Sequence, residues 1–422
     1  MEHTCVTLPG GLRLVQIPMP EMRSASVVVC VGVGSRYESD AKAGVSHLIE
    51  HMVFKGTERR PKARDISEAI ESVGGILNAS TDKELTVYWC KTAREHTPIA
   101  IDLLSDMLLR SRFGEADLAR EKNIIGEELA MLADDPQDWV QVLADEVLWP
   151  RHPLGREIAG SRESVRSLRR PDALAHMRQY YGPNNVVVGV AGGIDPDRVA
   201  ADLTEAFAGW ETVPAPPPLS ARGVLPTRSS YIEPKPIEQV NVCLTFPGIA
   251  RDDPDRWPLD MLCTIMGGGT SSRLFVRLRE RLGLVYDVGM YSSHFSDTGS
   301  VTVHCAMDSK NSERAIDGVF AEIERAQRRG IPAPELKKAK QFYRGRLSLG
   351  LEDTHSVATW FAVQEILRHR MITPEEATVA VEQVSGRDIT RVARELLKPE
   401  NARLVAVGPA TQLDMQARLA GA

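Results

Sequence analysis

The feature of this sequence that most constrains its fold is a proline-rich stretch near the middle, residues 209–230, GWETVPAPPPLSARGVLPTRSS. It contains five prolines. Proline cannot continue a helix and donates no hydrogen bond to a sheet, so the stretch predicts a stiff, extended linker. It lies almost at the midpoint of a chain of 422 residues, which is longer than one typical domain. We therefore expect two domains, residues 1–212 and 228–422, joined by a linker at residues 213–227.

The two halves of the chain show the same order of predicted elements. Strand-like runs open both halves, GLRLVQIP and SASVVVCVGVGS in the first and EQVNVCLTFPGI in the second. In each half a helix, a pair of strands and several helices follow. The last predicted strands are NNVVVGVAGGID and ARLVAVGP. This repeated order predicts an α+β fold with two similar domains, each a mostly antiparallel sheet packed with helices.

Composition and charge exclude several classes of protein. The formal net charge is −6 and no long basic run occurs, so a nucleic-acid partner is not expected. No apolar stretch reaches the roughly 18 residues of a membrane-spanning helix. The six cysteines are scattered without a C-x-x-C pair, which indicates buried apolar side chains or free thiols, and hence a reducing compartment. Because the N-terminus shows no basic and apolar leader, the expected location is the cytoplasm.

The segment SHLIEHMVFKGT, residues 46–57, places two histidines and a glutamate within five positions. On a helix His47 and His51 share one face, about 5–6 Å apart at Cβ, and Glu50 lies on that face too. Imidazole nitrogens suit zinc, and a catalytic zinc site needs three protein ligands and an open position. H-x-x-E-H is the inverted zinc-peptidase motif, with the glutamate as base. By itself the motif is also compatible with a helix that carries two exposed histidines and a solvent-facing glutamate.

A third ligand can come from LAREKNIIGEELAMLADDPQD, residues 118–138, which has the apolar stripe of a helix. Glu121 and Glu128 are two helical turns apart and share a face. Glu128 could therefore bind the metal while Glu121 hydrogen-bonds a histidine ligand. Glu127 is about 100° around the helix and should point elsewhere. An exposed acidic helix face would show the same spacing, so spacing alone does not decide between the two interpretations.

Several phrases resemble the pitrilysin-type inverted zinc metallopeptidases. GVSHLIEHMVFKGT is similar to the zinc helix of that family, and GGILNASTDKELTVYWC, EKNIIGEELAMLADDPQD and HPLGREIAG are similar to further segments of it. In the second half, MGGGTSSRLFVRLRERLGLVYDV resembles the glycine-rich turn, helix and strand of the second domain of that family. The likeness covers nearly the whole chain. It is greatest to short bacterial members related to the catalytic subunit of the mitochondrial processing peptidase.

The resemblance implies a role for each residue of the predicted metal site. His47, His51 and Glu128 would ligate one zinc ion per chain. Glu50 would act as general base. Glu121 would support a histidine ligand, since the family places a supporting glutamate seven residues before its ligand.

The resemblance also implies where the substrate binds. Asn78 and Ala79 would lie on an edge strand that binds the substrate backbone. Arg279 and Tyr286, seven residues apart, would contact the substrate near the scissile carbonyl. Without the family likeness, these two residues would be interpreted as a solvated arginine and a packed strand tyrosine.

The function implied is that of a zinc endopeptidase, which hydrolyses peptide bonds in extended peptides or presequence-like segments. The two domains would enclose a peptidase chamber, and the chain would form a homodimer. A heterodimer with an inactive homologue, or a non-catalytic subunit of a processing complex, is the alternative. The chain retains the whole zinc motif and the phrase RERLGLVY, which favours a self-sufficient enzyme. A purely structural zinc site conflicts with three ligands and an adjacent base.

Overall fold

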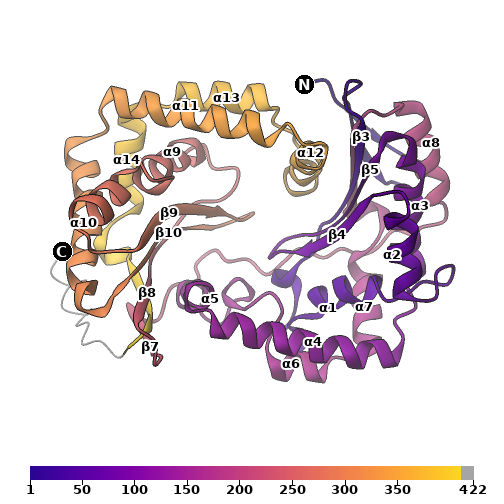
Figure 1. Cartoon of the computed structure of the whole chain (residues 1–422), viewed down its shortest axis with the longest axis horizontal. Coiled ribbons are helices and arrows are strands. Elements are labelled where there is room, and N and C mark those ends of the chain that lie inside the picture. The colour runs from indigo at the N-terminus through magenta and orange to yellow at the C-terminus, as the bar shows by residue number, and fades with distance from the viewer. Residues whose placement is uncertain (410–422) are drawn as a thin grey trace. The chain divides into compact units, whose positions relative to one another are not determined.

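The computed structural model describes residues 1–409, which pack as two compact units (Figure 1). The first unit consists of Met1–Leu129, Glu157–Leu219 and Leu347–Glu375. The second consists of Ala130–Arg156, Ser220–Arg346 and the described part of Glu376–Ala422. One boundary, between Leu219 and Ser220, falls inside the predicted linker, which contains no helix or strand. The units nevertheless differ from the two continuous domains predicted, because each includes a helix from the other half of the chain.

The first unit contains a six-stranded sheet in the order β1-β2-β6-β3-β5-β4. Strands β2 and β6 run parallel, and every other neighbouring pair is antiparallel. The strands are β1 (Thr4–Thr7), β2 (Arg13–Pro18), β3 (Ser24–Val31), β4 (Ile76–Thr81), β5 (Thr86–Ala93) and β6 (Val186–Gly192).

The second unit contains a five-stranded sheet in the order β7-β11-β8-β10-β9. Only β7 and β11 run parallel. The strands are β7 (Ser230–Pro234), β8 (Gln239–Pro247), β9 (Asp287–His294), β10 (Gly299–Asp308) and β11 (Arg403–Gly408). Apart from β1, the two sheets have the same topology. When the strands of each sheet are numbered along the chain, they lie side by side in the same order and run in the same relative directions. The predicted pair of similar, mostly antiparallel α+β domains is confirmed.

The helices cover the sheets, and α4, α11 and α13 contain residues of both units. The helices from the first half of the chain are α1 (Val45–Val53), α2 (Ala63–Glu71), α3 (Thr97–Arg110), α4 (Glu115–Asp134), α5 (Pro136–Leu148), α6 (Arg162–Ser167), α7 (Arg170–Tyr180) and α8 (Pro196–Ala206). The helices from the second half are α9 (Arg256–Gly267), α10 (Ser312–Arg329), α11 (Ala333–Gly350), α12 (Thr354–Arg368), α13 (Pro374–Gln383) and α14 (Gly386–Leu396).

The valine-rich run of β3 is buried on both faces of the first sheet. Val27 and Val29 face a core that includes residues of α1 and α3. Val28 and Cys30 face the opposite way, into a second core that includes Phe361 of α12. Successive side chains of a strand alternate between faces, so a sheet covered on both sides needs a continuous apolar run. This is the physical reason for the valine run in the sequence.

Two helices are exchanged between the units: each unit contains one helix that comes from the other half of the chain. Helix α12, from the second half, covers β2, β3 and β6 of the first sheet (Figure 1). Helix α5, from the first half, covers β8 and β11 of the second sheet. Gly189 allows the close approach of α12, because a Cβ there would lie 2.7 Å from the Ala358 carbonyl oxygen. The division of the chain at its proline-rich stretch could not reveal this exchange.

All six cysteines are free, as their scattered positions predicted. Within residues 1–409, no helix combines the length and apolar character needed to cross a membrane. Strands β1 and β7 were not predicted, and neither of them contains a fully buried residue.

Candidate metal centre

Helix α1 begins at a buried carboxylate. Glu38 accepts hydrogen bonds from the backbone N–H groups of Gly44 and Ser46, each over 2.7 Å. A carboxylate at this position satisfies unpaired N–H groups and favours the helix dipole. Gly44 has a positive φ of 89°, and a Cβ there would lie 2.3 Å from the carbonyl oxygen of Ala159. Ala159, in the segment HPLGREIAG, therefore lies close against the start of the helix that carries the histidines.

The two faces of α1 have different roles. Leu48, Ile49 and Met52 are fully buried in the core of the first unit. His47 and His51 lie on the other side, partly exposed, with ring centroids 4.6 Å apart. The helix thus presents its imidazoles from a rigid base.

Helix α4 lies beside α1 and brings Glu128 to both imidazoles (Figure 1). Glu128 Oε2 is 3.2 Å from His47 Nε2 and 3.6 Å from His51 Nε2. One ligand atom from each of the three residues lies within 4.8 Å of the others. Tetrahedral zinc with bonds of about 2.0–2.1 Å places ligand atoms roughly 3.3 Å apart, which is close to the two distances from Glu128 Oε2 to the imidazoles. Two imidazoles and one carboxylate also match the ligand set of catalytic zinc.

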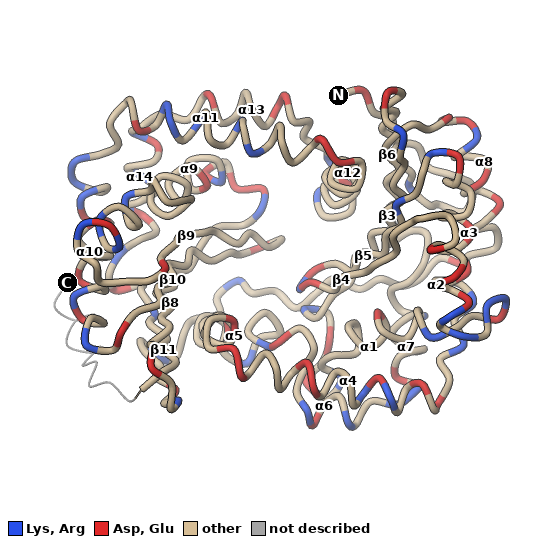
Figure 2. The backbone as a smooth tube through the Cα atoms, in the orientation of Figure 1, with Lys and Arg blue, Asp and Glu red and all other residues tan. Residues whose placement is uncertain are grey.

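Glu121 supports the metal group from the same helix. Its Oε2 is 3.1 Å from His51 Nδ1, and its Oε1 is 2.9 Å from Lys55 Nζ. The carboxylate accepts the Nδ1 proton of His51. The lone pair of His51 Nε2 therefore faces the metal group, which consists of His47, His51 and Glu128. Glu121 is buried, so it is not part of a plain exposed acidic face, and Figure 2 shows basic residues beside the acidic ones on α4. Sequence reasoning missed Lys55, although it lies four residues after His51.

Glu50 lies beside the metal group and accepts a hydrogen bond from Thr81. Thr81 Oγ1 is 2.5 Å from Glu50 Oε2, and His47 Nδ1 is 3.6 Å from the same oxygen. Burial would raise the pKa of the Glu50 carboxyl, but the nearby His47 imidazole and the hydrogen bond from Thr81 outweigh it and lower that pKa. Burial would lower the pKa of His47, but Glu50 and Glu128 outweigh it and raise that pKa. Glu50 is therefore an ionised carboxylate at neutral pH, as a proton acceptor must be.

Asn78 and Ala79 lie on β4, at the edge of the first sheet. Within residues 1–409, β4 pairs with β5 alone, so its other side is open. Asn78 is exposed and Ala79 packs partly on the core. The same strand ends at Thr81, which contacts Glu50. The structure therefore brings the predicted substrate-binding edge to the predicted base.

Arg279 and Tyr286 belong to the second unit. Arg279 lies in the π-helical segment Phe275–Arg281, with its guanidinium 4.9 Å from the centre of the Phe275 ring. Tyr286 precedes β9, and its backbone N–H donates to the Ala306 carbonyl over 2.8 Å. Its side chain is 56% exposed, so it is not a packed core tyrosine. Their contact with substrate stays a prediction.

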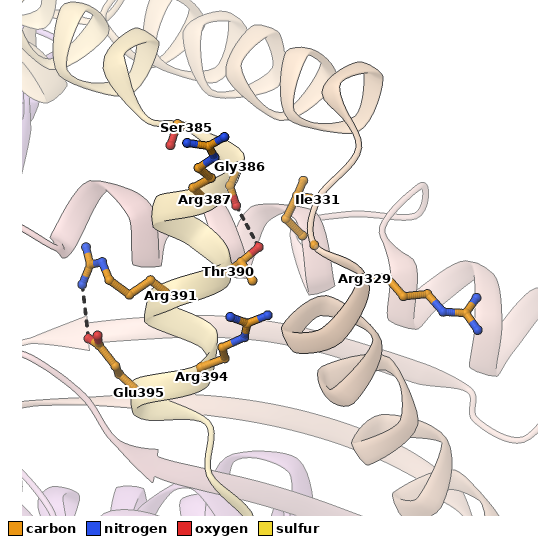
Figure 3. Close-up of a pocket in the computed structure, with 10 residues that line it drawn as sticks. Arg329, Ile331, Ser385, Gly386, Arg387, Thr390, Arg391, Arg394 and Glu395 are labelled. Carbon is orange, nitrogen blue, oxygen red and sulfur yellow. Dashed lines mark hydrogen bonds and ion pairs between the residues drawn. The ribbon is translucent and has the colours of Figure 1, made fainter.

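A hollow of about 830 Å³ in the second unit is a poor candidate for the active site (Figure 3). Its lining includes four arginines and no histidine or cysteine. Arg391 pairs with Asp255 and Glu395, and Arg394 donates to the carbonyl of Gln327. The three candidate metal ligands instead lie together in the first unit.

Comparison with known proteins agrees with this chemistry. Residues 13–162 match the family model described as Insulinase (Peptidase family M16), and residues 167–343 match the model described as Peptidase M16 inactive domain. An uncharacterized zinc protease of Streptomyces coelicolor is 36% identical over 410 residues, which cover 96% of this chain and 89% of that protein. This chain belongs to the M16 peptidase family. The predicted resemblance to pitrilysin-type zinc peptidases is thereby confirmed.

Other M16 relatives and structural neighbours span the same length. The uncharacterized zinc protease YmxG of Bacillus subtilis is 33% identical over 406 residues, which cover 96% of this chain and 97% of that protein. The crystal structure of a protease from Helicobacter pylori superposes with a TM-score of 0.90 at 22% identity and covers 97% and 100% of the two chains. A chain of Complex III2 from Candida albicans has a TM-score of 0.84 at 18% identity and covers 99% of each. These two structures show that the fold is shared.

The residues of the predicted site are divided between the segments that match the two M16 models. All five residues of the metal group and its supports lie within the segment that matches the peptidase model: His47, Glu50, His51, Glu121 and Glu128. Arg279 and Tyr286 lie within the segment that matches the inactive domain. Any metal-dependent chemistry of this M16 chain is therefore expected in the first unit.

A buried histidine under α1 predicts a loss of stability in acid. His176 Nε2 lies 3.2 Å from Ser46 Oγ, and burial lowers its pKa to about 4. The unfolded chain protonates this residue below about pH 6.5, whereas the folded chain stays neutral there. The free energy of unfolding should therefore fall by up to about 3 kcal/mol between pH 6.5 and pH 4 from this residue alone. Chemical unfolding of the metal-free protein across that range, with His176→Gln as comparison, measures this contribution; an equal slope in both proteins would contradict it.

Proposed function

We propose that this M16 chain is a zinc-dependent endopeptidase that hydrolyses peptide bonds in extended peptides or presequence-like segments. The observation that carries the proposal is the convergence of two imidazoles and a carboxylate, with the Glu50 carboxylate beside them. The zinc-protease names of relatives that span the whole chain support it. We propose one zinc ion per chain, because the described residues contain one such group.

The residues of this chain divide the reaction between them. A zinc ion held by His47, His51 and Glu128 would supply Lewis-acid chemistry, lowering the pKa of water and polarising a carbonyl. Glu50 would accept the proton of the attacking water and later deliver it to the leaving amine. Glu121 would hold His51 in the tautomer that presents Nε2.

The substrate would bind as an added strand on β4. The open edge at Asn78 and Ala79 offers backbone N–H and C=O groups to an extended peptide. Such pairing gives affinity with little dependence on sequence, so specificity would come from side-chain contacts on either side of the strand. Tyr286 or Arg279 would help to stabilise the oxyanion that develops on the scissile carbonyl.

We propose that the chain acts as a homodimer in which each copy is catalytically complete. A single chain carries both the metal group and the pair Arg279 and Tyr286, so no partner is needed to complete the residue set. A heterodimer with an inactive homologue, or a non-catalytic role in a processing complex, remains the alternative. A non-catalytic role would leave the arrangement of Glu50 beside the metal group without a purpose.

Cleavage profiling tests the proposed function. A library of unstructured peptides is incubated with the zinc-loaded protein, and new termini are identified by mass spectrometry. Internal cleavages should appear, should cease when a chelator removes the metal, and should return when zinc is restored. Cleavage that persists in the chelated protein, or a zinc-loaded protein that cleaves nothing, would overturn the proposal.

A further inference from the structure

The hydrogen bond between Thr81 and Glu50 joins two elements that are fixed independently. Helix α1 is anchored at its start by Glu38. The end of β4 is fixed by a tight hairpin, in which Thr81 pairs opposite Thr86 and the Asp82 N–H donates to the Leu85 carbonyl over 2.8 Å. Neither element depends on the Thr81 hydroxyl for its path. The hydroxyl is therefore free to serve the carboxylate that it contacts.

The direction of the Thr81 side chain follows from strand periodicity. Leu77, Ala79 and Thr81 point to the same face of β4, and successive residues alternate between faces. Leu77 and Ala79 pack against the core of the first unit. Thr81, the last residue of the strand, meets Glu50 where that packing ends. Its branched side chain restricts rotation about χ1, which limits the positions that the hydroxyl can take.

The two oxygens of Glu50 have different surroundings. Oε2 accepts the Thr81 hydroxyl over 2.5 Å and lies 3.6 Å from His47 Nδ1. Among residues 1–409, both of these contacts of Glu50 are made by Oε2 and not by Oε1. We propose that Thr81 is a positioning residue for the general base: it holds Oε2 and leaves Oε1 to receive the proton. This inference rests on the proposed function, since it assigns a role within the same reaction.

The arrangement also ties the base to the substrate-binding edge. Ala79 and Thr81 are two residues apart on the same rigid strand. The peptide that pairs with β4 and the carboxylate of Glu50 are therefore positioned by the same strand. A carboxylate without this support would sample other rotamers, and a displacement of about 1 Å can lower a rate roughly 100-fold. Thr81 would therefore affect the chemical step and leave substrate affinity unchanged.

The test compares two substitutions of Thr81. Thr81→Val keeps the branched shape and removes the hydroxyl, whereas Thr81→Ser keeps the hydroxyl. We expect Thr81→Val to lower kcat about 10- to 100-fold with KM, zinc content and Tm unchanged, and Thr81→Ser to recover most of the loss. In the Glu50→Gln background, Thr81→Val should cause no further loss, because the hydroxyl acts through that carboxylate.

Several outcomes would overturn the inference. They are a wild-type kcat in Thr81→Val, a loss of zinc or of Tm that accounts for its defect, an equal defect in Thr81→Ser, and an additional loss in the Glu50→Gln background. Failure of the proposed function has a different signature: Glu50→Gln itself would retain turnover. An inactive Glu50→Gln together with a fully active Thr81→Val would contradict the role of Thr81 alone.

Discussion

Replacing Glu50 with glutamine should leave zinc binding intact and lower peptide turnover by roughly 100- to 10,000-fold. The amide has nearly the same size as the carboxylate, so α1 and its imidazoles should stay in place. It cannot accept a proton, however, and the attacking water would lose its base. The measurement is kcat on a peptide identified by cleavage profiling, with bound zinc determined on the same sample.

The control for this substitution is the amount of bound zinc. The neighbouring pair of ligands must still bind the metal in the variant. If Glu50→Gln binds zinc as the wild type does and turnover falls, the carboxylate is the base. If turnover survives, another group accepts the proton and Glu50 has a structural role. A loss of zinc in this variant would instead assign Glu50 to the metal.

The local parts of the site could be predicted because they depend on helical spacing alone. His47 and His51 share a helix face because they are four residues apart. Glu121 and Glu128 share one because they are seven residues apart. The structure brings these residues together, with Glu128 on both imidazoles and Glu121 on His51. A helix repeats every 3.6 residues whatever surrounds it, so such a pattern survives without knowledge of the tertiary fold.

The remaining parts depend on contacts between distant segments, which spacing cannot supply. Thr81 reaches Glu50 only because a hairpin ends beside α1. Glu38 caps that helix from a loop before it. The exchange of α5 and α12 between the units follows from the need to cover both faces of each sheet, and no local signal identifies the helix that covers each face.

The valine runs contained more information than the strand prediction used. A run that is apolar at every position indicates a sheet buried on both faces. For β3, that pattern required a second covering helix, which α12 provides. The number of layers could therefore have been predicted from the strand alone, although the identity of the covering helix could not.

The zinc affinities of Glu128→Gln and Glu127→Gln distinguish the assigned metal ligand from its neighbour, since these adjacent residues of α4 are both exposed and carry the same charge. Glu128 Oε2 lies beside both imidazoles, whereas Glu127 is not part of the group. Loss of an outer partner weakens metal binding about 10- to 100-fold, and loss of a ligand should exceed this. Glu128→Gln should therefore bind zinc more than about 100-fold more weakly and lose turnover, while Glu127→Gln should retain both. Unchanged zinc affinity in Glu128→Gln, or a greater loss in Glu127→Gln, would contradict the assigned metal centre.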